Sequence, residues 1–200
     1  MLTVLVGNSP ITRDHAMLVD GADRVIRFNV PVTWDSGTGR RFDVWVIANG
    51  AAGRFFAHRR TFADAPYASL PSEIWFPRAS GVHGVLRSAQ PNGFLNTWAE
   101  DDFADAILRE NGLMQPWLRL DADFYWRCLE RLRAIDPSVD RTSIPSAGFM
   151  ALNRVLETQP GDSVTLVGFT FEGWPGHPWA IEEAFVRRAE ASGRLTLVPS

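Results

Sequence analysis

Residues 1–10 read MLTVLVGNSP, an apolar segment that runs straight into a polar turn. Residues 2–6 are apolar or β-branched without alternation, which is typical of a strand covered on both faces, as in a parallel sheet between helices. Two more runs of this kind follow at residues 25–28 and 42–48. The first part of the chain therefore predicts parallel strands joined by crossover connections.

The rest of the chain continues this alternation of strands and helices. Helical spacing and N-cap residues predict helices over 12–19, with Thr12 as N-cap, and over 96–111, 121–135, 146–156 and 179–191. Further strands are predicted at 74–76, 164–167 and 195–198, with residues 77–90 as a loop over the sheet edge. We expect one domain over residues 1–200, with a three-layer αβα Rossmann-like α/β fold and a mostly parallel sheet.

The composition excludes several classes of partner and site. Twenty Lys and Arg residues against 23 Asp and Glu residues give a net charge of −3, so no general attraction to nucleic acid is expected. Cys128 is the only cysteine, which excludes an internal disulfide and a multi-cysteine metal site. No apolar stretch reaches membrane-spanning length, and no signal-peptide pattern follows Met1. We expect a soluble cytoplasmic protein without a membrane span.

Asparagines follow each of the first three predicted strands, in the segments LVGN, RFN and IAN. Ligands of open parallel sheets bind beyond the carboxyl ends of the strands, where Asn8, Asn29 and Asn49 are expected. An amide can donate to a phosphate and accept from a ribose or base. Asparagine also favours strand exits for its turn geometry alone. Three in succession favour a nucleotide site, which would include the neighbouring Gly7 and Ser9.

A second candidate segment is IPSAGFMAL, residues 144–152. Its small residues Ser146, Ala147 and Gly148 open a predicted helix, where unpaired N–H groups and the helix dipole favour an anion. The alternative is an ordinary N-cap with small residues for close packing. The segment therefore predicts a nucleotide contact that needs support from other residues.

The third candidate segment is GHPWAIEE, residues 176–183. His177 precedes a predicted helix whose first turns carry Glu182, and a carboxylate so placed could orient an imidazole as a base near neutral pH. A histidine before a proline is more often a simple loop residue. Of the four histidines, His177 is the one that we select as a catalytic base, with Glu182 beside it.

Three further residues are candidate contacts to a phosphate or a sugar. Arg27 shares a strand face with Asn29 by the two-residue period, although a surface acid is an equally good partner for it. Arg78 follows the fourth strand, and Trp174 lies in a loop of the kind that walls a cleft. The segment Asp121-Ala122-Asp123 matches an Asp-x-Asp metal motif, but it opens a predicted helix, where acidic residues serve as caps. We expect no metal site.

The three candidate segments together resemble a known family. VLVGNSP, VIRFN and the following DVW resemble the large sialyl motif of glycosyltransferase family 29, the sialyltransferases. IPSAGFMAL with VTLVGF resembles the small motif, and His177 to Glu182 matches the very short motif His-x-x-x-x-Glu. The motifs occur in the family's order and cover about residues 1–48 and 143–190.

The resemblance implies a sialyltransferase-type GT-A variant of the predicted fold and an inverting, metal-independent glycosyltransferase. Its donor substrate would be a CMP-activated sugar such as sialic acid, with no separate cofactor, and its acceptor an unknown glycan or small molecule. Asn8 and Asn29 would contact the phosphate and ribose, and the helix start at 146–148 would hold the nucleotide. His177 would deprotonate the acceptor hydroxyl, with Glu182 helping to organise it.

The chain departs from the family in one motif. The third motif carries a histidine between the Gly-Phe strand end and the last motif, whereas here the interval reads TFEGWPG. Trp174 fills part of this interval and carries no charge. The chain also resembles small bacterial proteins known as urease operon accessory proteins, which share the GNSP and VIRFN opening. The alternative function is therefore a non-catalytic nucleotide-binding accessory protein on the same fold.

Overall fold

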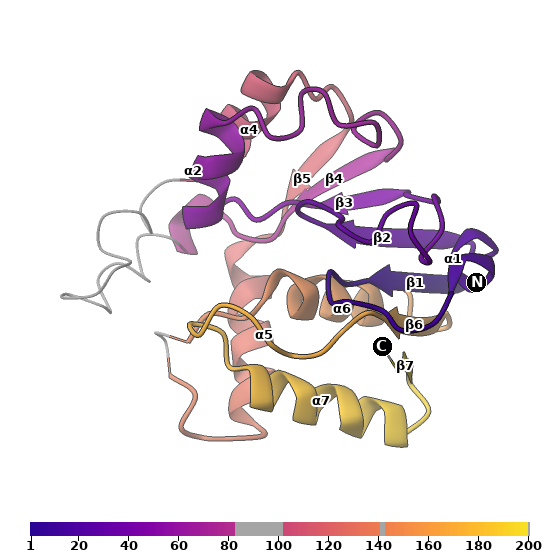
Figure 1. Ribbon diagram of the computed structural model, residues 1–200. Coiled ribbons are helices and arrows are strands. Elements are labelled where there is room, and N and C mark those ends of the chain that lie inside the picture. The colour runs from indigo at the N-terminus through magenta and orange to yellow at the C-terminus, as the bar shows by residue number, and fades with distance from the viewer. Residues whose placement is uncertain (83–101, 141–142, 200) are drawn as a thin grey trace.

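A computed structural model describes residues 1–82, 102–140 and 143–199 (Figure 1). Its seven-stranded sheet has the order β5-β4-β3-β2-β1-β6-β7, and every neighbouring pair is parallel. The strands are β1 (Leu2–Val6), β2 (Arg24–Phe28), β3 (Val44–Val46), β4 (Glu73–Phe76), β5 (Trp117–Arg119), β6 (Ser163–Val167) and β7 (Thr196–Val198). The predicted parallel α/β architecture is confirmed.

Helices cover both faces of this sheet. They are α1 (Ala16–Asp20), α2 (Ala51–His58), α4 (Ala104–Asn111), α5 (Ala122–Arg133), α6 (Ala147–Thr158) and α7 (Trp179–Ala191). In Figure 1, α2 and α4 lie at the top and α5, α6 and α7 at the bottom. None of the helices in the described residues is long and apolar enough to cross a membrane.

The unbroken apolar strands are explained by burial on both faces. In β3, Val44 and Val46 pack with residues of α6 and α7, while Trp45 between them packs in the cluster under α2 and α4. In β1, Leu5 faces α6, and Val4 packs toward α1 on the opposite face. Successive side chains of a strand point to opposite faces, so a strand between two helical layers needs apolar residues at every position.

The structure differs from the predicted elements at several places. The first helix begins at Ala16 rather than at residue 12. His15 and not Thr12 is its N-cap, and the side chain of Asp14 accepts the N–H of Ala16 at 2.8 Å. Residues 80–82 are helical, where a loop was predicted. Residues 83–90 of the predicted loop and residues 96–101 of the predicted helix 96–111 lie outside the described residues. Helix α2 and strand β5 were not predicted at all.

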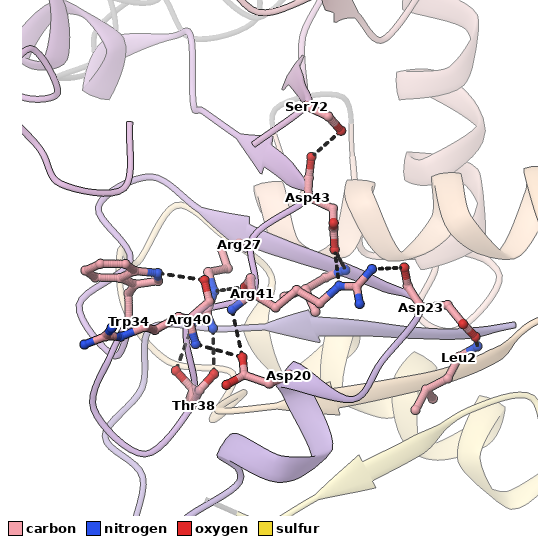
Figure 2. A network of polar contacts seen from close by, with 11 residues as sticks. Leu2, Asp20, Asp23, Arg27, Trp34, Thr38, Arg40, Arg41, Asp43 and Ser72 are labelled. Carbon is pink, nitrogen blue, oxygen red and sulfur yellow. Dashed lines mark hydrogen bonds and ion pairs between the residues drawn. The ribbon is translucent and has the colours of Figure 1, made fainter. Parts of the chain in front are cut away.

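Arg27 is not on the ligand side of the fold, which corrects the expectation that it reaches a phosphate or sugar. Its side chain is fully buried and donates to the Thr38 hydroxyl at 2.9 Å and to the carbonyls of Thr38, Gly39 and Arg41 at 2.6, 3.0 and 3.0 Å. Burial lowers the pKa of its guanidinium to about 10. Figure 2 shows the contacts with Thr38 and Arg41 beside those that Arg40 and Arg41 make with Asp20, so Arg27 supports the 33–41 loop.

Candidate functional site

A cavity of about 600 Å³ opens at the carboxyl ends of the strands. Its wall is formed by residues that follow β1, β2, β3, β4 and β6, together with the first residues of α2 and α6 and the loop between β6 and α7. The strand order reverses at β1, which lies between β2 and β6. Ligands of open α/β sheets bind at such a reversal, and the volume is that of a small-molecule site.

Two glycines bring the turns after β1 and β6 together at the base of the cavity. Gly7 donates its N–H to Val167 at 2.8 Å, and a Cβ at Gly7 would overlap the carbonyl oxygen of Gly168. Two residues further on, the Ser9 hydroxyl forms a hydrogen bond of 2.7 Å with the Thr170 hydroxyl. Gly7 and Ser9 therefore line the cavity as predicted, and Gly7 is required there for the close approach of the two turns.

Asn8 and Asn29 both line the cavity, but they use their amides differently. Asn8 Nδ2 donates to the Phe28 carbonyl at 2.9 Å, and its Oδ1 accepts from Val32 N–H at 3.3 Å, so both ends of the amide bind the protein. Asn29, in the left-handed region with φ 47°, accepts from Ala48 N–H at 2.9 Å through Oδ1. Within the described residues its Nδ2 has no hydrogen-bond partner, which leaves the two N–H donors of this group for a ligand.

Asn49 lies beneath the cavity wall and not in it, which corrects its predicted role as a nucleotide contact. It is fully buried and donates from Nδ2 to the Arg78 carbonyl at 2.7 Å and to Asp102 at 2.8 Å. Its Oδ1 accepts from Arg78 N–H at 3.3 Å. Asn49 therefore fixes the backbone of Arg78, the residue that does reach the cavity.

The start of α6 is a capped helix N-terminus that lies on the cavity, as the sequence predicts. Ser146 is the N-cap, and its hydroxyl accepts from Phe149 N–H at 3.0 Å. Ala147 and Gly148 line the cavity, and we find no hydrogen bond from their N–H groups to the described residues. A Cβ at Gly148 would come within 2.9 Å of the Phe169 ring. The small residues thus allow both close packing and access to two N–H donors.

Glu182 holds this helix start, and no hydrogen bond joins it to His177, unlike the predicted arrangement. The carboxylate is 1 % exposed and accepts from Ser146 N–H at 2.7 Å and from the Ser146 hydroxyl at 2.6 Å. Burial raises the pKa of Glu182 to about 7, against the opposing effect of the two hydrogen bonds. Glu182 therefore joins α7 to the first turn of α6.

His177 is oriented by a backbone carbonyl. Its Nδ1 lies 2.7 Å from the Ile144 carbonyl oxygen, and because a carbonyl only accepts, this nitrogen carries the proton. Nε2 is then unprotonated and can take a proton from a ligand. Burial lowers the pKa of the imidazole to about 4, and the Arg78 charge acts in the same direction, so the ring is neutral at pH 7.

Aromatic side chains surround this histidine and the rest of the cavity. Trp174 and Trp179 meet the His177 ring edge to face, each with centroids 4.9 Å apart. Trp174 lines the cavity as predicted and is 39 % exposed. Phe55 of α2 and Phe169 also line it. Sequence reasoning missed Phe55 because it missed α2, whereas Phe169 stood in the quoted VTLVGF segment without an assigned role.

Among the described residues, Arg78 is the arginine that lines the cavity, and its guanidinium packs over the backbone of Gly50. A Cβ at Gly50 would lie 2.9 Å from Arg78 Nη1, so the side chain occupies the space that a larger residue would fill. Burial lowers the pKa of Arg78. The structure thus brings Arg78 into the predicted site.

No group of three or more His, Cys, Asp or Glu side chains that could hold a metal ion occurs in the described residues. Asp121 is the N-cap of α5, and its Oδ1 accepts from Phe124 N–H at 2.6 Å. The interpretation of Asp121-Ala122-Asp123 as a helix cap is confirmed.

Comparisons with known proteins confirm the resemblances seen in the sequence. No family model matches the chain. It is 27% identical over 203 residues to the urease operon 23 kDa accessory protein of Rhizobium meliloti (strain 1021), with 96% of this chain and 90% of that protein aligned. This likeness spans nearly the whole length of both chains.

Solved structures of sialyltransferases share the fold. A mammalian sialyltransferase in complex with Gal-beta-1-3GalNAc-ortho-nitrophenol matches with a TM-score of 0.62 at 15% identity, over 98% of this chain and 68% of that chain. The sialyltransferase CstII from Campylobacter jejuni, in complex with the substrate analogue CMP-3FNeuAc, matches with a TM-score of 0.55 at 13% identity, over 98% and 78%. The chain therefore has a sialyltransferase-type fold.

Proposed function

We propose that this protein transfers a sugar from a CMP-activated donor, such as CMP-sialic acid, to an acceptor hydroxyl, with His177 as the general base and without a metal ion. The observation that carries the proposal is the hydrogen bond between His177 Nδ1 and the Ile144 carbonyl. It leaves the Nε2 lone pair of a neutral imidazole on a cavity at the sheet's switch point. The sialyltransferase-type fold supports the choice of donor.

The transfer forms one bond and breaks another, and groups on the cavity wall take up the proton and stabilise the leaving group. The acceptor oxygen forms a bond to the anomeric carbon, and its proton passes to His177 Nε2. The bond between that carbon and the phosphate oxygen breaks, and its electron pair stays on CMP. Inversion follows because the acceptor attacks the face opposite to the leaving phosphate. The phosphate gains negative charge, which N–H groups at the α6 N-terminus can stabilise.

A second candidate function is nucleotide binding without turnover, as an accessory protein. The similarity to a urease operon accessory protein over 96% of the chain favours it. So does the interval between Gly168-Phe169 and His177, which holds no histidine. Both functions require the same nucleotide site, so they differ only in whether His177 moves a proton.

The test combines binding and turnover on the same preparations. Titration calorimetry with CMP, and with UMP, GDP, NAD and S-adenosylmethionine as controls, is expected to show selective CMP binding. CMP release from CMP-N-acetylneuraminic acid is then measured with a panel of glycan acceptors. In His177→Ala we expect transfer to fall by about 10²- to 10⁴-fold with CMP affinity retained. His58→Ala, which changes an exposed histidine at the end of α2, is the matched control.

The outcomes separate the two functions. Selective CMP binding with no turnover on any acceptor supports the accessory function. Turnover that survives in His177→Ala contradicts the assignment of the base, and turnover abolished by EDTA contradicts the metal-free mechanism. Binding of another compound of the set in place of CMP contradicts both functions as stated.

A further inference from the structure

The Arg78 guanidinium is a cation on the wall of the cavity that has no partner among the described residues. It lines the cavity, and neither a hydrogen bond nor an ion pair joins it to any residue that the structure describes. The other ionisable groups on this wall are Glu172, His177 and Glu182, which bring no positive charge at neutral pH. Arg78 is thus the permanent positive charge among the described residues of the wall.

Asp102, the carboxylate whose charge acts on Arg78, does not pair with it, because other groups already bind its oxygens. Asp102 Oδ1 accepts from Asn49 Nδ2 at 2.8 Å and from Ala104 N–H at 3.0 Å. Its Oδ2 accepts from the Ser80 hydroxyl at 2.9 Å and from Arg119 Nε at 2.6 Å, which forms an ion pair. The charge of Asp102 is therefore balanced by Arg119, and its lone pairs are taken.

The fold holds the guanidinium in place at some electrostatic cost. Asn49 binds both the N–H and the carbonyl of Arg78, which fixes its backbone after β4. The guanidinium packs on Gly50, the N-cap of α2, whose first residues Ala51 and Ala52 also line the cavity. A cation beside a helix N-terminus is unfavourable because both carry positive charge, so an anion between them is favoured.

We propose that Arg78 binds the phosphate of the nucleotide and stabilises the negative charge that this phosphate gains as the sugar leaves, with Asn49 as its positioning residue. This inference rests on the proposed function and deepens it. In the transfer, the phosphate goes from one negative charge to two, because it keeps the electron pair of the broken bond. A planar guanidinium can bind two phosphate oxygens at once, which suits it to this role.

The sugar carboxylate of a sialic acid is an anion of similar chemistry, and the experiment distinguishes the two sources. Titration calorimetry compares cytidine, CMP and CMP-N-acetylneuraminic acid on the wild type, Arg78→Met and Arg78→Lys. In Arg78→Met we expect CMP affinity to fall by about 10- to 100-fold and cytidine affinity to stay unchanged. Arg78→Lys is expected to keep part of the preference for CMP. Arg188→Met, which removes an exposed arginine of α7, should behave as the wild type.

A CMP-to-cytidine affinity ratio that is the same in Arg78→Met as in the wild type overturns the proposal. The proposal is also overturned if Arg78→Met loses affinity for CMP-N-acetylneuraminic acid but keeps its affinity for CMP, since that result assigns Arg78 to the sugar carboxylate. Thermal unfolding without ligand is expected to show Arg78→Met melting no lower than the wild type, because the variant removes an unpaired, partly buried charge. Should the methionine variant fail to fold, an Arg78→Lys ratio equal to the wild type's overturns the bidentate role.

The same titrations with the pairs of AMP, UMP and GMP and their nucleosides separate this proposal from the proposed function. If the wild type prefers one of these nucleotides and Arg78→Met abolishes that preference, the role of Arg78 stands and the choice of a cytidine donor fails. If the wild type binds no nucleotide more tightly than its nucleoside, the role of Arg78 is refuted.

Discussion

Replacing Glu182 by glutamine tests whether burial, which raises the pKa of this carboxyl, outweighs its hydrogen bonds, which lower it. Its two oxygens accept from the N–H and the hydroxyl of Ser146, while the side chain is 1 % exposed. Glutamine keeps a carbonyl oxygen for the N–H and cannot ionise. The pH dependence of the stability difference between the two proteins therefore reports the ionisation of Glu182 alone.

The sign and size follow from the pKa of Glu182, which rises from 4.5 to about 7 on folding. A carboxyl whose folded pKa is raised stabilises the protein below its unfolded pKa, and this contribution is lost as the pH rises through the folded pKa. A shift of this size corresponds to about 3.4 kcal/mol in total, of which about 2.5 kcal/mol is lost between about pH 5 and pH 8. Relative to Glu182→Gln, the wild type should therefore weaken by this amount.

Urea unfolding followed by circular dichroism at several pH values between these limits measures the difference. Glu183→Gln is the control, since Glu183 is the neighbouring residue of α7 and pairs with Arg187 on the surface. That variant removes a carboxylate of the same helix without changing the bonds to Ser146. A difference for Glu182→Gln that is constant, or a wild type that gains relative stability with pH, would refute the reasoning, because the Ser146 donors would then outweigh burial.

Two further substitutions test the turns at the base of the cavity. Asn8→Ala removes the hydrogen bonds to Phe28 and Val32, so we expect a loss of about 1–3 kcal/mol in the free energy of unfolding, measured by urea denaturation. Weaker CMP binding at unchanged stability would instead show that the Asn8 amide binds the ligand. Gly7→Ala places a methyl group against the Gly168 carbonyl and should lower the free energy of unfolding by about 1–3 kcal/mol. Gly161→Ala, which has open space around it, should change this free energy by less than about 0.5 kcal/mol. Equal melting temperatures for the two variants would contradict the close approach of the two turns.

The elements with strong local signals could be predicted from the sequence. The predicted bounds 2–6 and 179–191 agree with β1 and α7, where an uninterrupted apolar run and a long helical pattern mark the ends clearly. Helix α2 was missed because its N-cap, Gly50, has no side chain to signal it and Gly53 interrupts the helical pattern. Strand β5 was missed because it is a partly exposed edge strand of 3 residues, too short for a pattern.

The candidate site was predicted by position better than by role. The strand-end rule places Asn8, Asn29 and Arg78 on one cavity, since parallel strands end at the same edge. It fails for Asn49, whose amide binds Arg78 and Asp102 instead of lining the cavity. Nor can it show that Glu182 binds Ser146 and not His177. Hydrogen-bond partners distant in sequence are set by tertiary packing, which a single sequence does not encode in any local pattern.

The placement of β1 between β2 and β6 has a consequence for how the chain folds. One neighbour of β1 follows it closely in sequence, but the other pairs Leu2 with Ser163, two residues that lie far apart in the chain. Forming this non-local pair requires closing a very long loop, which slows folding. During synthesis one edge of β1 stays unpaired until β6 has left the ribosome, and an open edge invites aggregation. Residues after both β1 and β6 line the cavity, so the cavity is complete only after β6 has been made. If the proposed nucleotide binds there, it would stabilise the completed sheet.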